Sequence, residues 1–179
     1  PDTAFLRSDE LPRRAATGLL SPTARSRRPA RVVRMSTAST TKIVDVNRGC
    51  YDTFAAIYDC PVPVISAVHG YCLGGGLELS LVADMPTAET SAISGTPDIR
   101  VGLPTSSGGV TRIGRVVGAG RARDLVLRGR RFDARQAEQW GIVTEIAAPG
   151  EHVKHATAVA PVLAEHFPLA LRITKRVLD

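Results

Sequence analysis

Aromatic side chains are scarce in this sequence of 179 residues, where Phe, Trp and Tyr together make up 4%. The core is therefore expected to consist mostly of Val, Leu, Ile and Ala side chains. No apolar run approaches the roughly 20 residues that cross a bilayer. The first residues also lack the basic and apolar pattern of a secretory signal. We expect a cytoplasmic protein that forms one domain and has no membrane partner.

Cysteine is also sparse, and the motifs of several common sites are missing. Cys50, Cys60 and Cys72 are an odd number without the spacing of a metal site, which favours reduced thiols. The sequence contains neither a phosphate-binding G-x-x-x-x-G-K-[ST] motif nor G-x-G-x-x-G, so nucleotide hydrolysis and a dinucleotide cofactor are unsupported. His152 and His155 have the spacing of one helix face, but no third ligand accompanies them. We interpret them as surface histidines and expect no metal.

Positive charge is concentrated at the start of the chain. The formal net charge is +6, and residues 1–40 hold eight arginines against three acids. Such an arm can bind a polyanion, but a solvated, disordered segment is the simpler interpretation. We expect residues 1–41 to be an atypical basic, disordered segment, residues 42–179 to form the folded domain, and no nucleic-acid partner. A nucleic-acid-binding arm stays open as the alternative.

The most informative stretch is residues 60–78, CPVPVISAVHGYCLGGGLE. Residues 62–68 form a short apolar run rich in β-branched side chains, typical of a buried strand. The glycines of residues 70–76 let backbone N–H groups approach a ligand closely. Residues 77–82 indicate the first turns of a helix. A strand, a glycine loop and a helix N-terminus together favour a site for an oxygen that becomes negative during a reaction.

The rest of the sequence alternates helix and strand signals, which predicts an α/β fold with helices covering a sheet. Residues 85–90 are interpreted as a loop or short strand, because Pro86 is unfavourable in a central strand. Residues 142–146 alternate like a strand. Asp133 is the predicted N-cap of a helix that Gly141 follows. The predicted helices are residues 44–59, 106–118, 122–127, 133–141, 151–166 and 169–178.

Three blocks of the sequence carry a family resemblance. They are VISAVHGYCLGGGLELSLVAD, then GTPD at residues 95–98, then LRGRRFDARQAEQWGIV at residues 127–143. In this order and spacing they resemble the crotonase superfamily, the enoyl-CoA hydratase/isomerase family. The resemblance runs from Val44 to the last residue and implies a ββα spiral with C-terminal helices, here partial. It also implies a domain that is incomplete at both ends and a homo-oligomer, either a trimer or a hexamer.

The same resemblance implies roles for individual residues. Glu78 stands at the first catalytic Glu of the family, Asp98 stands where hydratases usually have a second Glu, and Gly75 stands at the position whose N–H forms half of the oxyanion hole. Gly74 and Gly76 are expected to contact the substrate. From the residues alone, Glu78 is equally readable as a first-turn acid that the helix dipole favours, and Asp98 as a turn cap. His69 is interpreted as a turn residue rather than a base.

The implied reaction is the addition of water to the double bond of a 2-enoyl-CoA, with an acyl-CoA thioester as the partner. No cofactor is implied, since coenzyme A is part of the substrate. Two alternatives share the enolate chemistry, an acyl-CoA double-bond isomerase and a ring hydrolase. The loop that supplies the second oxyanion N–H in the family is not recognisable in residues 1–41. A catalytically inactive fragment is therefore a further alternative.

Overall fold

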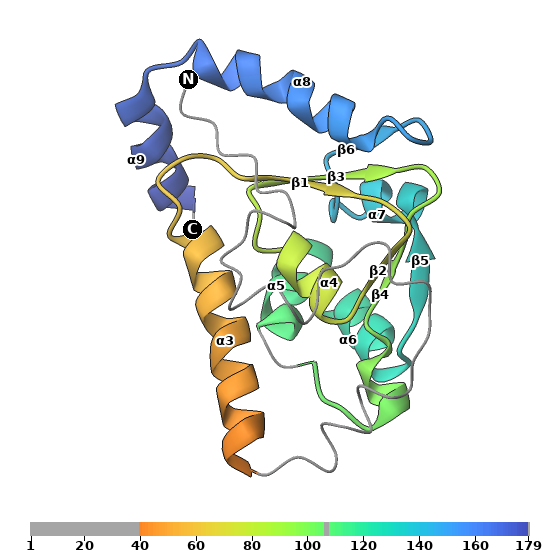
Figure 1. The fold of residues 1–179 in the computed structure, drawn as a ribbon. Helices are drawn as coiled ribbons and strands as arrows, with labels where there is room; N and C mark the ends of the chain where they lie inside the picture. Colours follow the sequence, from red (N-terminus) through yellow and green to blue (C-terminus); the bar gives the residue numbers. More distant parts are fainter. Residues whose placement is uncertain (1–39, 106–107, 179) are drawn as a thin grey trace.

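A computed structural model describes residues 40–105 and 108–178 (Figure 1). Residues 1–39 lie outside this range, and with them nearly all of the segment expected to be disordered. The first described helix begins at Thr40, four residues before its predicted start. The helices are α3 (Thr40–Tyr58), α4 (Gly75–Ser80), the 3-10 helix η1 (Pro97–Val101), α5 (Gly109–Val117), α6 (Ala119–Leu127), α7 (Ala134–Gln139), α8 (His152–Ala164) and α9 (Pro168–Leu178).

The described strands form two sheets of three strands each. In the first, β1 (Ile65–Val68), β3 (Met85–Glu89) and β6 (Glu145–Ala147) lie parallel in the order β1-β3-β6. In the second, β2 (Tyr71–Leu73) pairs in parallel with β4 (Ile93–Gly95), and β4 pairs antiparallel with β5 (Arg131–Asp133). Successive pairs of strands thus add one strand to each sheet, β1 and β2 first, then β3 and β4. The α/β class predicted from the sequence is confirmed.

Residues 85–89 form the short strand that is one of the two predicted alternatives, and Pro86 lies inside it although it is the central strand β3 of its sheet. In a parallel ladder the N–H and C=O of one residue face the same neighbouring strand. The Pro86 carbonyl accepts a hydrogen bond from the Thr144 N–H at 2.7 Å, so its missing donor also faces β6. The pairing of β3 with β6 begins only at Thr87 and Glu145. The proline is therefore tolerated because its missing N–H falls at the very end of that ladder.

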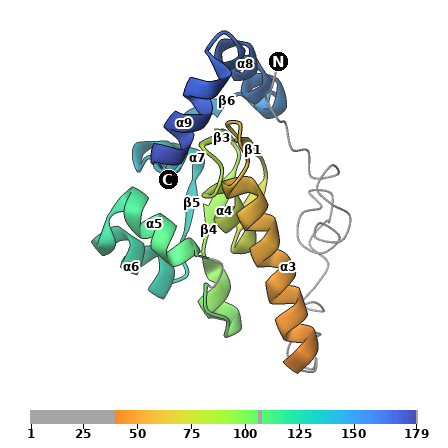
Figure 2. The same cartoon turned by 90° about the vertical axis from the view of Figure 1, so that its left-hand side faces the viewer.

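Helices enclose the two sheets on several sides. The long helix α8 lies over the β1-β3-β6 sheet, and α4 lies on its opposite side (Figure 1). After a quarter turn, α3 and the α5–α6 pair flank the strands on opposite sides (Figure 2). Gly118, with φ +77°, stands between α5 and α6 and allows the chain to reverse there. This arrangement leaves α4 and the glycine turn before it surrounded by β4, η1 and α5.

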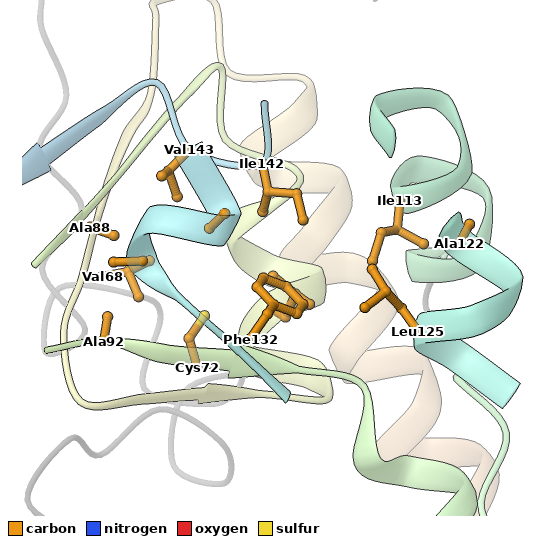
Figure 3. Close-up of a cluster of buried hydrophobic side chains, with 13 residues drawn as sticks. Val68, Cys72, Ala88, Ala92, Ile113, Ala122, Leu125, Phe132, Ile142 and Val143 are labelled. Atoms are coloured by element: carbon orange, nitrogen blue, oxygen red, sulfur yellow. The ribbon is translucent and has the colours of Figure 1, made fainter. Parts of the chain in front are cut away.

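The main core lies between the strands and the α5–α6 pair (Figure 3). It is largely aliphatic, as the scarcity of aromatic residues predicts, with Phe132 at its centre. Side chains from the strands and side chains from the helix pair lie on opposite sides of Phe132 and Ile142 in this view. The strand side consists of Val68, Cys72, Ala88 and Ala92, and the helix side of Ile113, Ala122 and Leu125.

Two contacts fix the later helices. Asp133 caps α7, as predicted, by accepting a hydrogen bond from the Gln136 N–H at 2.8 Å, and the Gln136 side chain accepts from the Asp133 N–H. Helix α9 is fixed by a buried cation. Lys175 of α9 is buried, and its Nζ lies 2.8 Å from Asp84 Oδ2. Asp84 Oδ2 also accepts a hydrogen bond from the Val64 N–H. The C-terminal helix is thereby held to the start of β1.

Candidate active site

The glycine turn leads directly into helix α4. Gly74 is the N-cap residue, with φ +54° and ψ −122°, a conformation that side chains disfavour. The first intrahelical hydrogen bond runs from the Glu78 N–H to the Gly74 carbonyl at 3.0 Å. The N–H groups of Gly75 and Gly76 precede this bond and belong to the donors that a helix leaves free at its N-terminus. Such donors suit an anionic oxygen, as the sequence predicted for Gly75.

Gly74 itself uses its N–H differently. That group donates a hydrogen bond to the Gly95 carbonyl at 2.9 Å and extends the pairing of β2 with β4. A substrate contact at Gly74 would therefore involve its α-carbon rather than its N–H. A Cβ built on Gly76 meets no atom within 4 Å, so this glycine borders open space.

Glu78 lies in the first turn of α4 but is buried, with 5% of its surface exposed. Its Oε1 accepts a hydrogen bond from the Gly109 N–H at 3.2 Å. A first-turn acid that serves only the helix dipole usually remains in water. Glu78 instead projects into the protein toward the first residue of α5.

Asp98 is the second residue of η1, and its side chain does not cap that helix. Its Oδ1 lies 2.7 Å from the position that a Cβ on Gly74 would occupy. Its Oδ2 is buried and has no hydrogen-bond partner among the described residues. Buried carboxylate oxygens are normally hydrogen-bonded, so this oxygen is available to a bound water or substrate.

Glu78 and Asp98 both lie near the start of α4. Asp98 packs against Gly74, and Glu78 lies in the first turn of the helix whose cap is Gly74. The site therefore combines the free N–H groups of a helix start with two carboxyl groups from different elements. This donor and acid set can hold a developing negative oxygen while protons move nearby.

The comparison with protein families decides the chain's membership. The family model described as enoyl-CoA hydratase/isomerase matches residues 34–179. The chain belongs to the enoyl-CoA hydratase/isomerase family. The resemblance to the crotonase superfamily drawn from the sequence is confirmed.

Individual relatives agree with this membership. YngF of Bacillus subtilis, provisionally named an enoyl-CoA hydratase/isomerase, is 36% identical over 126 residues, which are 70% of this chain and 48% of YngF. Carnitinyl-CoA dehydratase of Salmonella arizonae is 34% identical over 133 residues, covering 74% of this chain and 51% of that enzyme. The chain therefore spans about half the length of the curated relatives that it matches.

A solved structure confirms the fold. The enoyl-CoA hydratase of Bacillus anthracis superposes with a TM-score of 0.76 at 30% identity, covering 80% of this chain and 55% of that one. The two-sheet arrangement with C-terminal helices is thus the crotonase fold that the sequence predicted, present here in part.

Cys72 lies beside the site, but its thiol has low reactivity. It is buried on β2, and burial raises the pKa of its thiol to about 12, although a hydrogen bond with Ser94 acts in the opposite direction. A thiol with this pKa is protonated near neutral pH and is a poor nucleophile. The three cysteines, all of them described, form no disulfide with one another.

Three of the four histidines, His69, His152 and His155, contact other side chains. The ring of His69, an exposed residue directly after β1, stacks on that of His152 with centroids 4.4 Å apart. His152 and His155 contact different acids, Glu89 and Glu145, so they do not converge as a metal pair. The described part of the chain holds no group of three His, Cys, Asp or Glu residues arranged for a metal ion.

Every described helix is too short or too polar to span a bilayer.

Sequence reasoning missed one residue of the site, Gly109. A sequence-level signal existed, because Gly108 and Gly109 are adjacent and precede a helix. Nothing in the local sequence indicates, however, that Gly109 meets Glu78 from 31 positions away. The neighbouring Ser106 and Ser107 lie outside the described residues.

Proposed function

We propose that this chain is an acyl-CoA-binding enzyme that adds water to the double bond of a 2-enoyl-CoA through an oxyanion-stabilised enolate. One observation carries the proposal: the buried Glu78 lies in the first turn of α4, and Asp98, whose Oδ2 has no hydrogen-bond partner among the described residues, lies beside Gly74, the cap of the same helix. Hydration needs two groups that transfer protons and one hydrogen-bond donor for the thioester oxygen. Glu78 and Asp98 are the proposed proton-transfer groups, and the Gly75 N–H is the proposed donor.

In the proposed reaction, the Gly75 N–H donates a hydrogen bond to the thioester oxygen and stabilises the enolate. One carboxylate takes a proton from water as the oxygen of that water bonds to C3 of the acyl group. A carboxylic acid then delivers a proton to C2, so the elements of one water molecule are added and no electrons are exchanged. Glu78 and Asp98 share these two tasks. Each contributes on the order of 10²–10⁴-fold when correctly placed.

The proposed substrate is an acyl-CoA thioester, with coenzyme A as part of the substrate and no further cofactor. Family membership and the name of the Salmonella relative support this class. We further propose a homo-oligomer as the assembled form and the cytoplasm as its compartment. The dehydratase name of that relative describes the loss of water, which is the reverse direction of the proposed reaction.

Asp98 favours a second candidate within the same chemistry. Asp is one methylene shorter than Glu, and a misplacement of about 1 Å in a reacting group costs on the order of 10²-fold. A double-bond isomerase or a ring hydrolase would use the enolate site with one altered carboxylate. Because the chain spans only about half of its relatives, a catalytically inactive domain is the alternative from a different class.

The deciding experiment is the hydration of crotonyl-CoA, followed as the loss of absorbance of the conjugated thioester. Glu78→Gln and Asp98→Asn keep the shape of each side chain and remove the acid. The control is Glu138→Gln, an exposed position on α7. We expect wild-type turnover that the control retains and that both test variants lose by at least 10²-fold. Turnover unaffected by the two test variants would refute the assigned roles.

Binding separates the remaining outcomes. If folded wild-type chain does not hydrate crotonyl-CoA, titration calorimetry with crotonyl-CoA distinguishes an acyl-CoA protein with another reaction from an inactive domain. Binding without hydration favours the isomerase or hydrolase alternative. The absence of both contradicts the proposed function.

A further inference from the structure

The first residue of α5 touches the Glu78 side chain. Gly109 follows Gly108, whose φ of +87° turns the chain into the helix. The Gly109 N–H is one of the donors at a helix start, and it points at Glu78 Oε1 from 3.2 Å. Both groups are buried, so water does not weaken this hydrogen bond.

The Glu78 side chain occupies the space that a side chain at position 109 would need. A Cβ built on Gly109 would lie 2.5 Å from Glu78 Cγ, 2.6 Å from Oε1 and 3.0 Å from Cδ. All three of these atoms belong to one side chain. By contrast, a Cβ built on Gly114, in the same helix, meets nothing within 4 Å. The absence of a side chain at position 109 therefore matters to Glu78 in particular.

We propose that Gly109 is a positioning residue that sets the orientation of the Glu78 carboxylate. Its N–H holds Oε1, and its bare α-carbon admits the end of the side chain. An added methyl group at position 109 displaces the carboxylate while leaving its chemistry intact. The catalytic consequence rests on the proposed function, whereas the positioning itself does not.

The displacement has a measurable catalytic effect. A shift of about 1 Å in a reacting group costs on the order of 10²-fold in rate. Gly109→Ala should therefore lower kcat for crotonyl-CoA by about that factor and change KM little, because Gly109 positions an acid rather than the CoA. In a Glu78→Gln background the same substitution should cost nothing further.

A stability cycle tests the positioning without any activity. We would measure thermal unfolding midpoints of the full chain for Gly109→Ala, Glu78→Ala, their combination, and Gly114→Ala as the matched control. Gly109→Ala should lower the midpoint, and Gly114→Ala should not, since alanine suits a helix better than glycine. In the Glu78→Ala background the effect of Gly109→Ala should disappear, because the cavity accepts the methyl group.

The carboxyl carbon of Glu78, observed by NMR after ¹³C labelling, gives a second readout. Its chemical shift should move in Gly109→Ala and stay unchanged in Gly114→Ala. An unchanged signal in Gly109→Ala, or an equal loss of stability with and without Glu78, would overturn the proposal. If Gly109→Ala does not fold, the double variant decides: recovery supports the contact, and continued failure refutes it.

The two proposals fail in different ways. Coupling between Gly109 and Glu78 without any crotonyl-CoA hydration supports the positioning and contradicts the hydratase function. Hydration that depends on Glu78 but not on Gly109 supports the function and contradicts the positioning.

Discussion

The carboxylate of Asp98 occupies the space that a side chain on Gly74 would need. Asp98 Oδ1 lies 2.7 Å and Oδ2 3.3 Å from the position of a Cβ on Gly74. Gly74 also has a φ of +54°. The positive φ of the backbone and the lack of space for a Cβ are two independent reasons for a glycine at the start of α4.

Gly74→Ala should destabilise the protein strongly. The φ of +54° and ψ of −122° at Gly74 cost about 1–3 kcal/mol for a residue with a Cβ, and the close contact with Asp98 adds about 1–3 kcal/mol. Denaturant unfolding should show the combined loss. The matched control is Gly76→Ala, where the Cβ meets nothing within 4 Å. Equal losses in both variants would contradict this account.

Lys175→Met should release α9 from the start of β1. The variant leaves Asp84 without its cation and removes the donor that serves the carbonyls of Ile57 and Val62. Breaking a buried ion pair costs about 3–5 kcal/mol, and we expect about 2–3 kcal/mol because the Asp84 side chain is 20% exposed. Denaturant unfolding of the variant and the wild type measures this loss of unfolding free energy.

The control for Lys175→Met is Arg176→Met, an exposed neighbour on the same helix. The double variant with Asp84→Asn should lose less than the sum of the two single losses, because both remove the same contact. Strict additivity would show that Lys175 acts through something other than Asp84.

Glu89 should give the protein an acid-sensitive step in stability. A hydrogen bond from the Ser91 hydroxyl, then one from the Gly150 N–H and the nearby His152, lower the pKa of this carboxyl below its ordinary value of 4.5. The folded state therefore binds the proton less tightly than the unfolded state. The stability that the carboxylate contributes is present above pH 4.5 and is lost as the pH falls through the folded pKa.

The measurement compares Glu89→Gln with the wild type in unfolding free energy between about pH 7 and pH 3. The difference should be largest near neutral pH and should shrink below pH 4.5. Glu165→Gln, an exposed position, provides the reference. A difference independent of pH would show that Glu89 contributes packing alone.

Cys72 should resist alkylation in the folded protein. Burial raises the pKa of its thiol to about 12, so almost no thiolate exists at pH 8. We expect iodoacetamide at pH 8 to modify Cys72 only after unfolding in urea, as peptide mass spectrometry would detect. Cys60, which is partly exposed, serves as the internal comparison. Modification of both thiols at the same rate in the folded chain would contradict the burial.

Features encoded by neighbouring residues were predictable from the sequence. Asp133 caps α7 as predicted, and its partner Gln136 lies only three positions away. The helix predicted over residues 44–59 is present as α3, and its Phe54 and Ile57 are buried. Glu78 and Asp98 could be named because their motifs are local, although the roles assigned to them stay predictions.

Features that depend on distant partners were not predictable. Strand β2 has only three residues within a glycine-rich stretch, and its pairing with β4 defines it as a strand. Pro86 is tolerated because of where β6 begins. The spacing of His152 and His155 indicated one helix face, but the acids that they contact lie on β3 and β6. In each case the deciding partner is far away in the sequence.

The way in which strands are added to the two sheets also has a consequence for the order of folding. The contact between Val64 and Asp84, at the start of the β1–β3 ladder, closes a loop of 20 residues. The contact of Gly150 with Glu89 spans 61 residues, and that of Lys175 with Ile57 spans 118. Because the entropy lost on loop closure grows with loop length, the β1–β3 ladder should form first. Helix α9, which carries Lys175, should therefore dock last during folding and detach first during unfolding.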